Sequence, residues 1–91
     1  MAPEEVLVRL VELAREGGLQ VREVAGSPGD DLPVRSAIGR LRDGFYVVLV
    51  GSEPLEDRIE LVARAIRQHC PGASEGRYLP PALRMRLDEP G

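Results

Sequence analysis

A run of six apolar residues, Phe45 to Val50, directly follows Asp43-Gly44 and places the strongest constraint on how this 91-residue chain can fold. An apolar run without alternation is typical of a central strand that is covered on both faces. The preceding segment, Val34 to Leu41, alternates polar and apolar residues, as a strand with one face in water does. A tight turn containing Gly44 would close the two strands into a hairpin. Residues 34–50 therefore predict the centre of a sheet.

Two amphipathic segments on either side of this hairpin predict helices. The first covers residues 3–16, begins with a Pro and two acids, and ends at Gly17-Gly18. The second covers residues 54–69, with Ser52 as its expected N-cap, and ends before Pro71-Gly72. Each carries apolar residues at helical spacing along one side, so each should bury that side against the sheet.

Three further segments complete the expected fold. Leu19 to Val24 alternates imperfectly, as a half-buried or edge strand does, and the Pro- and Gly-containing segment from Ala25 to Pro33 predicts a loop. Ala82 to Leu87 predicts a short final helix that could dock on the sheet or on a neighbouring chain. We therefore expect an α+β fold in a single domain, residues 1–91. Its small, three-stranded, largely antiparallel sheet is packed by two main helices plus a short C-terminal helix.

The apolar strand also predicts self-association. Two main helices cover only one face of a three-stranded sheet well, whereas Phe45 to Val50 calls for cover on both faces. We therefore expect a homodimer formed through the sheet or the terminal helix, and a function as a non-catalytic protein-interaction or self-association module. The expected contacts of this interaction surface are Leu79, Leu83, Met85 and Leu87.

The composition removes several classes of function. All 12 basic residues are Arg, so catalysis that depends on a lysine amine is excluded. The absence of Lys and Asn fits a GC-rich genome or a thermophile-like composition. Cys70 is the single cysteine and cannot form an internal disulfide, and the first residues lack the pattern of a signal peptide, so a cytoplasmic protein is expected. The longest apolar run is far shorter than a membrane-spanning helix, and no contact with a membrane is expected.

His69-Cys70 is the one combination of an imidazole and a strong nucleophile in the chain. Neighbouring residues on a helix point about 100° apart, so the two form a poor catalytic dyad. A helix-end His and a small buried Cys explain them more simply. A zinc site within one chain lacks further ligands, although two copies of the pair could share a site across a dimer axis. We therefore predict no catalytic residues, no metal, no cofactor and no enzymatic activity.

Carboxylates occur in two groups that could serve acid–base chemistry or bind a hard cation. Asp30-Asp31 lies in the predicted loop, where Asp commonly caps turns. The second group begins the second helix and is explained by a solvated helix face; it comprises Glu53, Glu56, Asp57 and Glu60. On that face Glu60 is expected to pair with Arg64, four residues later.

The alternative function is binding of nucleic acid or a small anion. Arg35, Arg40 and Arg42 fall on or beside the 34–50 hairpin, and Arg22 could join them from a neighbouring strand. The net charge of -3 gives no global attraction for phosphates, so binding would depend on this local patch.

The order of helix, strand, loop, hairpin and long helix over residues 3–70 resembles the N-terminal half of ImmA/IrrE-type metallopeptidase domains, whose long helix bears His-Glu-x-x-His. On the segment Leu55 to His69, the resemblance puts Ala63 and Arg67 at the two zinc-ligand positions and Arg64 at the general-base position. It therefore implies a metal-free relative of a peptidase that keeps the scaffold for binding. The segment Tyr78-Leu79-Pro80-Pro81 lies outside it. Residues 54–69 also resemble the corresponding part of small uncharacterised bacterial proteins that end in a similar Tyr-Leu-Pro-Pro element, which implies no activity.

Overall fold

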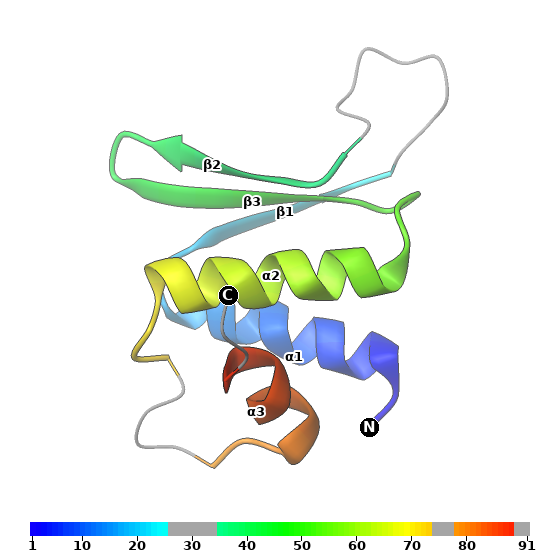
Figure 1. Ribbon diagram of the computed structural model, residues 1–91. Coiled ribbons are helices and arrows are strands. Elements are labelled where there is room, and N and C mark those ends of the chain that lie inside the picture. The colour runs from blue at the N-terminus through cyan, green and yellow to red at the C-terminus, as the bar shows by residue number, and fades with distance from the viewer. Residues whose placement is uncertain (26–34, 74–77, 89–91) are drawn as a thin grey trace.

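The computed structural model describes residues 1–25, 35–73 and 78–88. Within these ranges the chain forms three helices and three strands (Figure 1). In chain order they are α1 (Pro3–Glu16), β1 (Gln20–Val24), β2 (Ala37–Leu41), β3 (Gly44–Val50), α2 (Leu55–His69) and α3 (Pro81–Asp88). The predicted α+β class is confirmed. The expected loop 25–33, with Asp30-Asp31, lies almost entirely outside the described residues.

The sheet has the strand order β1-β3-β2, so β3 is the central strand, as its apolar sequence predicts. β2 and β3 form the expected antiparallel hairpin, with Leu41 opposite Gly44 and Ala37 opposite Val48. β1 pairs with β3 in parallel, with Gln20 opposite Tyr46. The sheet is therefore mixed, because β1 and β2 lie on opposite sides of β3 and run in opposite directions.

The helices form two layers beneath one face of the sheet (Figure 1). α1 and α2 lie side by side against that face, and α3 packs on them from the side away from the sheet. The terminal helix thus docks on the helix pair of its own chain and not on the sheet. No helix in the described part of the chain is long and apolar enough to cross a membrane.

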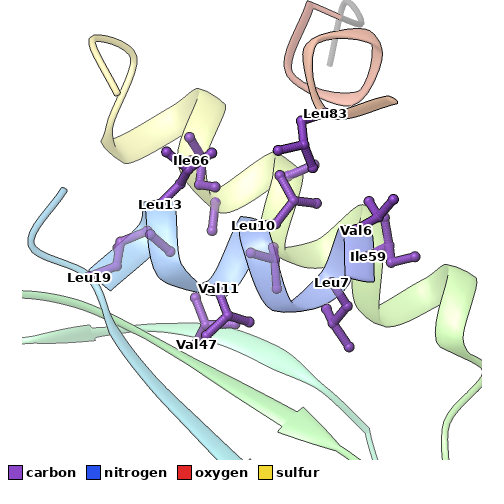
Figure 2. Packing of buried hydrophobic residues seen from close by; sticks show 14 of the residues in the cluster. Val6, Leu7, Leu10, Val11, Leu13, Leu19, Val47, Ile59, Ile66 and Leu83 are labelled. Atoms are coloured by element: carbon purple, nitrogen blue, oxygen red, sulfur yellow. The ribbon is translucent and has the colours of Figure 1, made fainter. Parts of the chain in front are cut away.

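The core fills both interfaces between these layers. Figure 2 shows Val11 of α1 against Val47 of β3, and Leu83 of α3 directed at the helix pair. Leu83 has no exposed surface and Leu79 is 4% exposed, so both are core residues of this chain. This corrects their assignment to an interaction surface: each buries its side chain within its own domain. Of the four residues predicted there, Met85 is exposed and Leu87 is partly buried.

The first helix ends as its two glycines predict. Gly18 has a positive φ of 97°, and the N–H groups of Gly18 and Leu19 donate to the carbonyls of Arg15 and Ala14 at 3.1 and 2.9 Å. This is a Schellman arrangement, which favours glycine at the position with positive φ. The second helix differs from expectation, because Pro54 rather than Ser52 precedes its first residue and no side chain caps it.

Candidate functional site

A groove runs between the free edge of β2 and the exposed side of α2, and we call it the β2–α2 groove. Its volume is about 500 Å³. The strand side consists of residues 36–40 together with Phe45 of β3. The helix side consists of Leu61, Arg64, Gln68 and His69. The groove therefore joins an open strand edge to a mixed apolar and basic helix surface.

Two sets of contacts fix the walls of this groove. At one end, the Phe45 and His69 rings stack with their centroids 3.6 Å apart and an interplanar angle of 17°. At the other end, the Val50 N–H donates to the Ser36 hydroxyl at 2.8 Å, and the Ser36 N–H donates to the Glu53 carboxylate. β2 is thus held at its start by side-chain hydrogen bonds and packs on α2 through Ile38, which is partly buried against the core. The groove does not depend on a ligand to hold it open.

The charged groups in the groove are basic. Arg40 and Arg64 line it and are exposed, and none of the described lining residues is acidic. Neither arginine forms an ion pair with another described residue. The expected pair of Glu60 with Arg64 is wrong, because Glu60 accepts instead from Arg67 at 3.0 Å. The guanidinium of Arg64 is therefore left available to a ligand.

Arg67 connects α2 to α3 rather than serving a site. Besides Glu60, it donates to the backbone carbonyl of Arg86 at 2.6 Å. Arg86 in turn pairs with Glu56 near the start of α2. Only 12% of the Arg67 side chain is exposed, so these bonds lie between packed helices. The acidic face predicted for α2 is thus partly engaged in holding the terminal helix.

The three predicted anion-binding arginines do not form one patch. All three are exposed, but Arg35 precedes β2, Arg40 lies near its end and Arg42 lies in the turn to β3. An extended chain separates Arg35 from Arg40 by roughly 16 Å. Arg40 is the member that lies close to other functional groups, because it lines both the β2–α2 groove and a hollow on the opposite face of the sheet.

His69 and Cys70 have separate partners. The His69 ring stacks on Phe45, whereas the Cys70 thiol donates to the Gly17 carbonyl at 3.4 Å. Burial raises the pKa of the Cys70 thiol, which favours the protonated and less nucleophilic form. The two side chains thus contact different partners, and burial disfavours the thiolate form that a nucleophilic cysteine uses.

The positions that the metallopeptidase resemblance assigns to zinc chemistry carry other contacts. Ala63 is completely buried in the core, and Arg67 is bonded to Glu60 and Arg86. Among the described residues, no group of three or more His, Cys, Asp or Glu side chains is placed to hold a metal ion. Arg64, at the general-base position, lines the β2–α2 groove.

The helix side of the groove was missed in the sequence. Leu61, Arg64 and Gln68 recur at helical spacing beside the core stripe of α2, and this second stripe was the available signal. No family model matches the chain, and no curated protein or solved structure shows significant similarity to it. The resemblance to ImmA/IrrE-type domains therefore stays a prediction.

Proposed function

We propose that this domain is a protein-interaction module that binds an extended, acidic segment of a partner protein in the β2–α2 groove. The observation that carries the proposal is the juxtaposition of two features: an edge of β2 that pairs with no other described strand, and a groove whose described charged lining residues are all basic. Each half of this arrangement recognises a different feature of the partner.

The strand edge recognises the backbone. β2 is the outer strand of the sheet, so on its side away from β3 alternate residues direct N–H and C=O groups outward. An extended segment can pair with these groups as an additional strand, which is a common mode of peptide recognition. The segment would lie above the Leu61, Arg64 and Gln68 side of α2, where alternate side chains can contact the helix.

The basic lining selects the partner's charge. Arg40 and Arg64 can each form a bidentate bond with a carboxylate. A second copy of this chain fits the groove less well than an acidic segment, because a two-fold pairing through β2 would bring the arginines of both copies together. The homodimer that the sequence predicts is therefore one of the outcomes that the test below distinguishes.

The test is selection of extended peptides from a random peptide display library on the immobilised domain. We expect selected sequences to alternate Asp or Glu with apolar residues. Binding of the best selected peptide is then measured by fluorescence anisotropy, and backbone amide shifts of β2 are followed by NMR. Arg64→Glu should weaken binding about five-fold, from one lost ion pair and one new repulsion.

Arg22→Glu is the matched control, because it makes the same charge change at an exposed residue outside the groove. It should leave peptide affinity within two-fold of the wild type, roughly the measurement error in such a comparison. Selected peptides without acidic residues, or equal losses in both variants, would contradict the proposal. So would light scattering that shows a wild-type dimer dissociated by Arg64→Glu, since the groove would then bind a second copy.

A further inference from the structure

The sheet face turned away from the helices carries a second set of groups, and we call it the open face (Figure 1). Residues on one face of a strand alternate, and directly paired residues share a face. The register therefore places Gln20 and Arg22 of β1 beside Tyr46 and Val48 of β3. It places Gly39 of β2 on the other side of Tyr46.

Tyr46 lies across Gly39. A Cβ atom added at residue 39 would collide with the far end of the Tyr46 ring, so the missing side chain makes the room that the ring occupies. The Tyr46 side chain is only partly buried, which leaves part of its surface on the open face. An aromatic ring laid along a strand in this way presents a platform on which a planar group can stack.

Hydrogen-bonding and charged groups surround this platform. A hollow of about 460 Å³ is lined by Gln20, Val21, Arg22, Arg40, Leu41, Tyr46 and Val48. Among its described charged lining residues, Arg22 lies on the open face and forms no ion pair with another described residue. Arg40 is opposite Phe45 and therefore belongs to the face of the β2–α2 groove. The Gln20 amide, opposite Tyr46 in the register, can both donate and accept hydrogen bonds. The ligand that combines a planar ring, polar ring edges and flanking negative charge is a nucleotide unit.

We propose that the open face binds single-stranded nucleic acid, with a base stacked on Tyr46, the Gln20 amide at the base edge, and a phosphate contacted by Arg22. This site is separate from the β2–α2 groove and does not rest on the peptide-binding proposal. Stacking supplies affinity for any base, and Arg22 supplies attraction for the backbone despite the net charge of -3.

The size of the open face favours this ligand over a second copy of the chain. Three strands about 4.8 Å apart, of five, five and seven residues, have a flat footprint of roughly 270 Å², against about 800 Å² per partner in a stable protein interface. Two such faces would also bring the Arg22 side chains of both copies together, with no acid among the described residues that line the hollow. A short stretch of single strand matches both the area and the charge.

The experiment measures binding of a fluorescein-labelled oligouridylate of about ten nucleotides by anisotropy at several salt concentrations, with a duplex of the same length and free UMP as comparisons. Tyr46→Ala should weaken binding about ten-fold or more, whereas Tyr46→Phe retains the stacking ring and most of the affinity. Arg22→Glu should weaken binding and reduce the slope of log affinity against log salt by about one. Circular dichroism checks that each variant is folded.

Arg64→Glu serves as the control of equal charge and should leave oligouridylate binding within about two-fold of the wild type. Absence of binding at low salt, or affinity indifferent to Tyr46→Ala, would overturn the proposal. Free UMP binding as tightly as the oligonucleotide would overturn it in favour of a nucleotide site. A wild-type dimer in light scattering that Tyr46→Ala dissociates would overturn it in favour of self-association. Peptide binding in the groove should survive both open-face substitutions, so the two proposals fail separately.

Discussion

Truncation of Leu83 tests whether α3 belongs to the core of this domain. Leu83 has no exposed surface and is directed at α1 and α2 (Figure 2). Leu83→Ala removes about three buried methylene equivalents, worth roughly 2.4 kcal/mol at about 0.8 kcal/mol each. The cavity left behind adds a further cost, partly relieved because α3 can shift on the helix pair. We expect the free energy of unfolding to fall by about 3 kcal/mol.

The assay is urea unfolding followed by circular dichroism at two protein concentrations. Met85→Ala is the matched control, because Met85 lies two residues away on the same helix and is 70% exposed. Its substitution should change the free energy of unfolding by less than about 0.5 kcal/mol. The comparison separates burial of the side chain from any effect on the helix itself.

Two results would refute this reasoning. A cost below about 1 kcal/mol for Leu83→Ala would mean that the packing of α3 contributes little to stability. A cost that shrinks as the protein is diluted would mean that Leu83 is buried against a second chain, as the sequence pattern alone allowed. A concentration-independent cost near 3 kcal/mol would support a core role within one chain.

Three further substitutions test individual contacts. Arg67→Met removes the bonds to Glu60 and to the Arg86 carbonyl and should lower the free energy of unfolding, measured in urea, by about 1–3 kcal/mol. An unchanged urea midpoint would mean that these two bonds do not stabilise the packing of α3 on α2. Gly39→Ala forces the Tyr46 ring aside and should cost about 1–3 kcal/mol, most of which disappears when Tyr46→Ala is already present in a double-mutant cycle. Because burial raises the pKa of the Cys70 thiol, the unfolded chain releases that proton first. The thiol's contribution to the free energy of unfolding is therefore complete below pH 9.0 and is lost as the pH rises above it. When urea unfolding is measured across this pH range, the free energy of unfolding should fall less for Cys70→Ala than for the wild type.

Local signals located the regular elements with small errors. The helices expected over residues 3–16 and 54–69 are Pro3–Glu16 and Leu55–His69, because helical periodicity and terminal Pro and Gly residues act within a few turns of the chain. The hairpin turn at Asp43-Gly44 was likewise predictable, because its signal lies in adjacent residues. The start of β2 was placed too early, at residue 34 instead of Ala37, since strand ends depend on pairing with β3.

The candidate sites were less predictable. The arginines of the hairpin were predicted to form a local basic patch, but Arg35 lies apart from Arg40, and Arg64 was assigned to a pair with Glu60. Glu60 and Arg67 lie seven residues apart on α2, and the guanidinium that bonds Glu60 also donates to the Arg86 carbonyl of α3. Sequence spacing identifies which side chains can meet along one helix, but it does not show which of them are also held by a contact with another helix.

The sequence by itself determined which residues form helices and strands, which stripe of each is apolar, and which chemistries the chain lacks. Tertiary structure decided what each apolar stripe meets. It placed β1 parallel to β3, put Leu83 in the core while leaving Met85 exposed, and laid Tyr46 over Gly39. The physical reason is that periodicity records the need for burial but not the identity of the covering surface, which depends on contacts between residues distant in the chain.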